Sequence, residues 1–340
     1  MHVGRKVVMM LGFVFFQCSW AATIETSGLV EVEYNSAKDF EGAKTSRFAL
    51  ATVELGVDAE LDKNISSHVL FLYEQGNTEF DADEGTITYK IGASPVAVTA
   101  GKMYVPFGRF ETMMISDPLT LEIGETNETA LHLTFKNDLV TAGVYAFNGD
   151  TIKADMAADG DDTMDHFGAH LGLQFKPGPL DISVGASYIN SLADSDGISG
   201  VLSEITDGTT LADYSAGVSA YLDVGFKGFW LLGETVTTQD AFAVDRLPFD
   251  GKESKPSATN IELSYTLDSG GHNLTLGFAL QSTEQAMALR LPETRTLFAL
   301  SYGSAEGAAI GLEVGSDKDY EVGGEQKDGS LVNIQLAVEF

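Results

Sequence analysis

The chain has 340 residues, with 20 Lys and Arg against 50 Asp and Glu, which gives a net charge of −30 at pH 7. So acidic a surface excludes nucleic acid as a partner, because the phosphate backbone is bound mainly through Lys and Arg. Aromatic residues make up 10% of the chain and hydrophobic residues 44%, so the charge does not indicate a disordered protein.

The first 21 residues are typical of a secretory signal peptide. Arg5 and Lys6 form a short basic region, and an apolar run follows from Val7 to Phe16. Ser19-Trp20-Ala21 then places small residues at the two positions that a signal peptidase reads, so we predict cleavage after Ala21. A transmembrane anchor is the alternative, but the apolar run is short for a membrane span.

Cys18 is the single cysteine of the chain and lies within this predicted leader. It raises the alternative of a lipoprotein, but Phe16-Gln17 is a poor lipobox because the residue before the cysteine should be small. Cleavage would leave a chain without disulfides, which a closed barrel in an oxidising compartment does not need.

No later stretch approaches the ~20 apolar residues of a membrane helix, so the exported chain is expected to be either a soluble secreted protein or a β-barrel. Segments with period-two alternation recur instead, which is typical of strands. In the segment 48–60, Ala49 and Leu55 are expected to face outward and Glu54 inward. We predict strands at 24–34, 48–60, 69–73, 87–91, 96–103, 131–135, 140–146, 167–175, 182–188, 214–224, 226–236, 261–267, 274–280, 297–304, 310–314 and 330–340.

Short and long connections alternate between these segments. Asp62-Lys63-Asn64 and Pro177-Gly178-Pro179 are short turns, whereas 148–165 and 191–213 are long and polar. The pattern predicts an all-β protein in the bacterial outer membrane: a transmembrane antiparallel β-barrel of about 16 strands over residues 22–340. A barrel of that size normally encloses a water-filled lumen.

The last segment, Ser330 to Phe340, shows the alternation clearly. One face carries Val332, Ile334, Leu336, Val338 and Phe340, and the other carries mainly polar side chains. The segment resembles the closing strand of bacterial outer-membrane barrels. The resemblance implies that Phe340 is part of an insertion signal read by the barrel-insertion machinery. The alternative is an ordinary half-buried strand.

The stretch 101–128 breaks the alternation. Pro106, Gly108 and Pro118 interrupt regular structure. An exposed outer loop would not need the apolar residues Val105, Phe107, Phe110, Met113, Met114 and Ile115. We therefore predict a loop folded inward onto the barrel wall, where it narrows the pore; a poorly patterned strand and hairpin is the alternative.

Charged residues on and beside this loop are the candidates for solute contact. They are Lys102, Arg109, Glu111, Asp117 and Glu122, which we predict to bind the substrate or line the pore constriction. Charged side chains in a lumen tune which solutes pass, while the lipid-facing surface maintains the barrel.

The stretch GKMYVPFGRFETMMISDPLTLEIGET, residues 101–126, resembles the corresponding stretch of the LbtU family of siderophore porins. Its specific part is VPFGRF and SDPLT, whereas the wider resemblance lies in length, strand rhythm and the closing Phe340. The resemblance implies a barrel without a TonB-type plug domain that passes an iron-siderophore across the outer membrane. The alternative is a general or cation-preferring diffusion porin, for which an acidic lumen and an inward loop suffice.

The sequence offers little for catalysis. It has no G-x-S-x-G and no H-E-x-x-H motif. His166 and His170 share one face of a strand, but lie roughly 13 Å apart, too far to hold one metal ion. We therefore expect no enzyme, no cofactor and no metal site. The expected partners are a siderophore or small solute, outer-membrane lipids and lipopolysaccharide, and the insertion machinery, with monomer and trimer both open.

Overall fold

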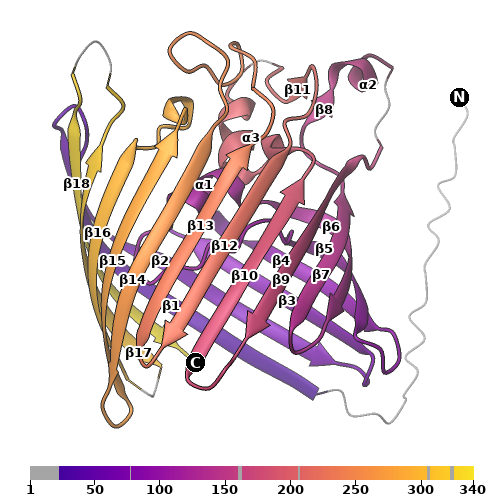
Figure 1. The fold of residues 1–340 in the computed structure, drawn as a ribbon, viewed down its shortest axis with the longest axis vertical. Coiled ribbons are helices and arrows are strands. Elements are labelled where there is room, and N and C mark those ends of the chain that lie inside the picture. Colours follow the sequence, from indigo (N-terminus) through magenta and orange to yellow (C-terminus); the bar gives the residue numbers. More distant parts are fainter. Residues whose placement is uncertain (1–22, 77, 160–162, 206, 305–306, 322–324) are drawn as a thin grey trace, which may run out of the picture.

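The computed structural model describes residues 23–340 except 77, 160–162, 206, 305–306 and 322–324, so the predicted leader 1–21 lies outside the described residues. Within the described part, sixteen strands form one closed antiparallel barrel (Figure 1). The predicted fold is therefore confirmed. Within the described residues, no helix is both long enough and apolar enough to cross a membrane.

The barrel strands occur in chain order around the wall. They are β1 (Thr23–Lys38), β2 (Lys44–Glu60), β3 (Ile65–Glu74), β4 (Thr78–Lys90), β5 (Val96–Tyr104), β6 (Asn127–Lys136), β7 (Val140–Phe147), β9 (His166–Phe175), β10 (Leu180–Ile189), β12 (Gly217–Phe226), β13 (Phe229–Thr238), β14 (Ser257–Asp268), β15 (His272–Glu284), β16 (Thr294–Ser304), β17 (Ala308–Lys318) and β18 (Asp328–Glu339).

The first and last strands close the barrel. β1 pairs with β18 in antiparallel register, with Val30 opposite Val338. Beyond this ladder, the backbone N–H of Gly28 donates to the Phe340 carbonyl at 2.8 Å, and the Phe340 N–H donates to the Gly28 carbonyl at 3.0 Å. Closure leaves no unpaired edge, which is the requirement for a sheet in lipid.

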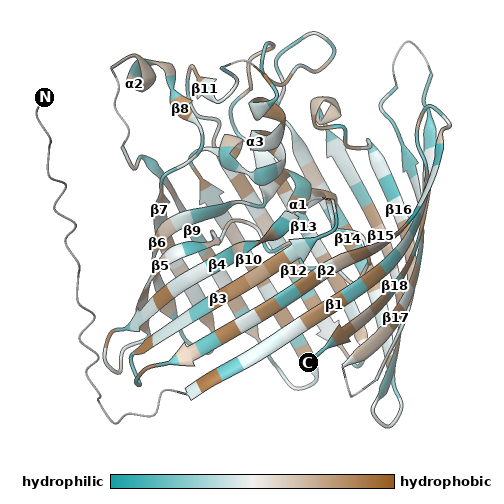
Figure 2. Cartoon of the chain, turned by 180° about the vertical axis from the view of Figure 1, so that it is seen from behind, coloured by the Kyte–Doolittle hydropathy of each residue, from teal (hydrophilic) through white to brown (hydrophobic). Residues whose placement is uncertain are grey.

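The period-two pattern places apolar side chains on the outside. On β18, Val332, Ile334, Leu336 and Val338 are 37–53% exposed on the outer face, whereas Asn333 is only 8% exposed and points inward. Figure 2 shows the same alternation of hydrophobic and hydrophilic positions along the strands. The barrel therefore presents the apolar outer band expected of a transmembrane barrel.

The alternation is interrupted by a bulge in β2. The register with β1 shifts between Glu31, which is opposite Thr52, and Val32, which is opposite Leu50. Before the bulge, Phe48 is 73% exposed on the outer face and Ala49 is 4% exposed and points inward. The prediction that Ala49 faces outward with Leu55 was wrong, because the extra residue reverses the face of every preceding position.

Connections at one end are short turns, whereas most of those at the other end are long, so the long-loop end is the outer mouth (Figure 1). The long connections contain elements that the sequence did not predict. These are the helices α1 (Leu119–Gly124), α2 (Ala154–Asp159) and α3 (Asp196–Ser203), the single 3-10 turns η1 (Leu192–Asp194) and η2 (Met287–Leu289), and the parallel pair β8 (Ile152–Lys153) and β11 (Thr210–Leu211).

An apolar core occupies part of the barrel interior. Leu119 and Ile123 of α1 are buried with Ile198 and Leu202 of α3, and Val236 of β13 belongs to the same cluster. α1 contacts β13, β14 and β15 as well as α3. This side of the outer mouth is therefore filled by packed side chains, and the core holds α1 in place against the wall.

Candidate functional site

A loop of residues 105–126, the constriction loop, connects β5 to β6 and includes α1. Val105 and Phe107 are 4% and 1% exposed, and Met114 is 8% exposed. These apolar residues pack on the inner wall, so the predicted inward folding of the loop is confirmed. Met113, by contrast, is 37% exposed.

Buried glutamates of the barrel wall hold the backbone of this loop. Glu234 of β13 accepts hydrogen bonds from the backbone N–H groups of Arg109 and Phe110, at 2.7 and 2.9 Å. Glu262 of β14 accepts from the Met113 N–H at 2.8 Å. An irregular segment must satisfy its backbone donors outside a helix or sheet, and here carboxylates do so.

Glu313 of β17 is the third anchor. It accepts from the backbone N–H groups of Ile115 and Ser116 at 2.7 and 3.2 Å, and from the Asn333 amide at 3.1 Å. Glu313 and Glu262 are 0% and 1% exposed. A buried carboxylate is costly unless it is hydrogen-bonded, so wall and loop stabilise each other.

The loop turns sharply at Gly108-Arg109-Phe110. Gly108 has φ +76° and Phe110 has φ +55°. A Cβ on Gly108 would lie 2.2 Å from the Phe110 ring, so this position needs glycine for space as well as for its φ angle. The turn presents two successive backbone N–H groups to Glu234, and it directs the Arg109 side chain to another part of the lumen than Asp117.

Asp117 and Glu122 form the acidic face of the loop, and both side chains are exposed to the lumen. Enclosure within the barrel raises the pKa of Asp117, and the charges of Glu74 and Glu33 raise it further. Enclosure, followed by the charge of Asp117, also raises the pKa of Glu122. Loop and wall are thus both acidic at the constriction.

Among the charged groups that affect the pKa of Asp117, one is an arginine, and it partly offsets the negative charge. Arg295 of β16 opposes the rise in the pKa of Asp117, and also that of Glu122. The guanidinium, however, already forms a bidentate pair with Asp317, at 2.9 and 3.0 Å. Asp317 therefore balances much of its charge, and the carboxylates of Asp117 and Glu122 have no dedicated cationic partner in this pair.

The acidic face extends outward to Glu125 and Asp196. Burial, followed by the charge of Asp196, raises the pKa of Glu125 to about 8. Burial also raises the pKa of Asp196 to about 6, against a backbone hydrogen bond from Asn127 and the nearby charge of Lys102. Lys102, on β5, donates to the Ala82 carbonyl at 3.3 Å.

Arg109 and Glu111 lie apart from Asp117 and Glu122. The Arg109 guanidinium pairs with Asp223 of β12 at 2.7 Å and with Glu111 at 2.8 Å, and lies 5.0 Å from the centre of the Tyr221 ring. It also borders a cavity of about 540 Å³ that reaches the turn at Asn137. The five predicted site residues therefore lie in three places. Arg109 and Glu111 form one group, Asp117 and Glu122 form the second, and Lys102 lies near Asp196.

Sequence reasoning missed the wall residues that complete the site. These are Glu33, Glu74, Asp223, Glu234, Glu262 and Glu313. Their signal is a carboxylate at an inward position of a strand, as in Leu312-Glu313-Val314. Alternation shows that such a residue points inward, but not that a loop some 200 positions earlier supplies its partners.

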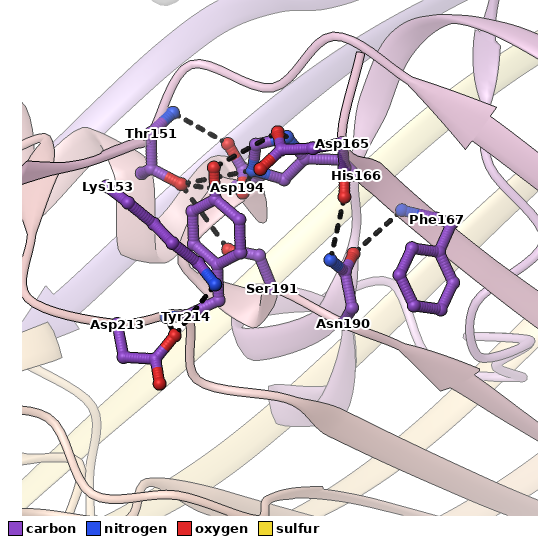
Figure 3. A network of polar contacts seen from close by, with 10 residues as sticks. All are labelled: Thr151, Lys153, Asp165, His166, Phe167, Asn190, Ser191, Asp194, Asp213 and Tyr214. Atoms are coloured by element: carbon purple, nitrogen blue, oxygen red, sulfur yellow. Dashed lines mark hydrogen bonds and ion pairs between the residues drawn. The ribbon is translucent and has the colours of Figure 1, made fainter. Parts of the chain in front are cut away.

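A second polar network lies in the outer loops (Figure 3). Nε2 of His166, a residue 2% exposed, lies 3.0 Å from Asp194, and its Nδ1 lies 3.2 Å from Asp165 without the alignment of a hydrogen bond. Asp194 also accepts from the Thr151 N–H and hydroxyl, both at 2.8 Å. The network therefore joins the outer connection that carries Thr151 to the one that carries Asp194.

No group of three or more His, Cys, Asp and Glu side chains within the described residues is arranged to hold a metal ion. The expectations of no enzyme and no cofactor remain predictions, since such an absence does not test them.

The chain is similar in sequence to proteins from two bacterial species. It is 25% identical over 322 residues to a UPF0422 protein of Legionella pneumophila, covering 87% of this chain and 59% of that one. It is 24% identical over 278 residues to a UPF0422 protein of Coxiella burnetii, covering 79% and 58%. The chain thus spans about three fifths of these relatives' length. No protein-family model matches the sequence.

Several solved structures, among them an outer-membrane channel, share the fold. The channel DcaP of Acinetobacter baumannii gives a TM-score of 0.63 at 14% identity, covering 94% of this chain and 97% of that one. OmpF of Salmonella typhi gives 0.61 at 9% identity, covering 93% and 97%. The trimer form of OmpT of Vibrio cholerae gives 0.56 at 13% identity, covering 94% and 100%. The protein is an outer-membrane β-barrel with a porin-like fold.

Proposed function

We propose that the protein is an outer-membrane diffusion channel whose acidic constriction favours cationic solutes. The observation that carries this proposal is the placement of Asp117, which the charges of Glu33 and Glu74 reach, beside Glu122, with Arg295 paired to Asp317. Carboxylates that line a narrow aqueous passage raise the local concentration of cations and repel anions.

The backbone anchoring supports the same function. A constriction selects solutes only if its charged groups keep their positions, and the hydrogen bonds to Glu234, Glu262 and Glu313 hold the loop that carries Asp117. The apolar core around α1 adds to this rigidity. Sites built on a rigid support give better-defined selectivity than sites on loose loops.

The direct experiment is a reversal-potential measurement on the purified protein in a planar bilayer with a KCl gradient. A cation-preferring channel gives a reversal potential that is shifted toward the K⁺ equilibrium potential. This shift becomes smaller as the ionic strength rises, because salt screens the carboxylates. A reversal potential near zero in low salt, or one of the opposite sign, contradicts the proposal.

Passage of an iron-siderophore is the second candidate. It rests on the resemblance of residues 101–126 to siderophore porins, and that stretch contains the constriction loop. The acidic lumen favours iron complexes that are neutral or cationic over anionic polycarboxylate complexes. This function is tested by iron-siderophore uptake in a deletion strain with and without plasmid complementation.

Unrelated small solutes serve as controls in that strain. A specific loss of iron-siderophore entry supports siderophore passage, whereas an equal loss of all solutes leaves a general cation-preferring pore. Normal entry of every solute is evidence against both candidates.

A further inference from the structure

Two histidines meet inside the barrel away from the acidic constriction. His132 of β6 and His170 of β9 place their Nε2 atoms 3.0 Å apart. Both side chains point into the lumen, since their neighbours Leu131 and Leu171 are 49% and 50% exposed on the outer face. His170 also lines the cavity of about 540 Å³ below the constriction loop.

The barrel wall between the two imidazoles leaves room for them to come close together. β7 separates β6 from β9, and its residue Gly143 lies opposite His170. A Cβ on Gly143 would lie 2.5 Å from each Nε2 atom. The glycine therefore leaves room for both rings above the middle strand, so that His132 and His170 can converge from strands that do not pair.

The distance between the nitrogens suits a metal ion. Bonds of about 2.0–2.1 Å place adjacent nitrogens about 2.8–3.0 Å apart in a square-planar complex, and about 3.3 Å apart in a tetrahedral one. The observed 3.0 Å agrees with adjacent positions of a tetragonal ion. In this structure the two nitrogens share a hydrogen bond, and the Thr134 hydroxyl lies 3.0 Å from Nε2 of His132, so a bound ion would replace these hydrogen bonds. Imidazole with tetragonal geometry is the preference of Cu²⁺ and Ni²⁺.

We propose that His132 and His170 form a lumenal binding site for a tetragonal transition-metal ion, Cu²⁺ above all. Two protein ligands leave the remaining coordination positions to water or to the donor atoms of a passing solute, so the ion exchanges readily. The nearby guanidinium of Arg109 does not prevent occupation, because it is paired with Asp223 at 2.7 Å.

The test is Cu²⁺ titration of the purified, chelator-treated barrel, followed by calorimetry and electron paramagnetic resonance. The wild type is expected to bind one Cu²⁺ at this site with two nitrogen ligands. His132→Gln and His170→Gln should each weaken binding by more than the roughly tenfold typical of changing a residue beside a metal ligand. His272→Gln, in a different part of the barrel, is the matched control and should bind as the wild type does.

Gly143→Ala tests the geometry while both histidines remain. The added methyl would force the two Nε2 atoms apart, so the two-nitrogen spectrum should disappear. Gly303→Ala is its control, because a Cβ there meets no atom closer than 3.9 Å. Heat-modifiability on gels verifies assembly of each variant. The proposal is overturned if His132→Gln and His170→Gln bind Cu²⁺ as the wild type does, or if the wild-type spectrum has no nitrogen ligands; the pair is then an imidazole hydrogen bond only.

Discussion

The backbone N–H of Ile115 donates a 2.7 Å hydrogen bond to Glu313, a residue 198 positions later in the chain. Ile115 belongs to the constriction loop and Glu313 to the barrel wall. The bond is charge-assisted and enclosed by protein, so it is stronger than a bond between neutral groups. It fixes the loop two residues before Asp117, and so determines where the acidic face lies.

Loss of this anchor should loosen the constriction. In Glu313→Gln an amide nitrogen replaces one of the two accepting oxygens, so either the Ile115 and Ser116 N–H groups or the Asn333 amide loses its acceptor. An unsatisfied buried donor costs about 1–3 kcal/mol, so we expect larger and noisier single-channel conductance and faster proteolysis within the loop.

Glu253→Gln is the matched control for this variant, because Glu253 lies exposed in an outer connection. It should leave conductance unchanged. If Glu313→Gln also conducts as the wild type does, Glu313 does not hold the loop.

Opposite changes of charge at the two faces of the loop should alter selectivity in opposite directions. Asp117→Asn removes a lumenal carboxylate, and we expect the K⁺/Cl⁻ permeability ratio to fall roughly two- to fivefold, the equivalent of ~0.4–1 kcal/mol. Arg109→Gln leaves Asp223 and Glu111 without their cation, so the ratio should rise. Reversal potentials at one low ionic strength measure both variants. An unchanged ratio in Arg109→Gln would mean that the Arg109 cluster does not act on the passage, and a fall would contradict the expected sign.

Selectivity should also depend on pH. The pKa of Asp196 is raised to about 6 and that of Glu125 to about 8, so these carboxyls are neutral at low pH and gain charge as the pH rises through those values. Cation preference should therefore increase between pH 5 and pH 9. Reversal potentials measured across that range test this expectation. In Glu125→Gln the part of the increase near pH 8 should be lost. A cation preference that does not change with pH would contradict the prediction.

The close contact of α3 with α1 should limit substitution at one glycine. A Cβ on Gly197 would lie 2.0 Å from the backbone carbonyl oxygen of Glu122, whereas a Cβ on Gly200 meets nothing within 4 Å. Gly197→Ala should destabilise the barrel mouth by about 1–3 kcal/mol and displace Glu122. Gly200→Ala, in the same helix, should be neutral or stabilise it by up to ~1 kcal/mol.

Thermal unfolding followed by the gel shift of the folded barrel measures both variants. Equal thermal unfolding midpoints for Gly197→Ala and Gly200→Ala would show that α1 and α3 can move apart without loss of stability.

The sequence by itself determined the barrel. Alternation depends on local residue types, because each strand must show apolar side chains to lipid and polar ones to the lumen. Sixteen strand segments could be predicted from this alternation. The inward loop could be predicted as well, because Val105 and Phe107 would be unfavourable together on a loop exposed to water. The reversed face of Ala49 escaped prediction because a bulge adds one residue without any change in composition.

Only the tertiary structure decided which residues meet. The glutamate partners of the constriction loop lie on strands more than 100 residues later, and strand closure rather than spacing brings Glu234, Glu262 and Glu313 to it. Likewise His170, which shares a face with His166 in the sequence pattern, meets His132 across Gly143 instead. Alternation gives the direction of each side chain, but barrel curvature and loop packing determine which of them come within bonding distance.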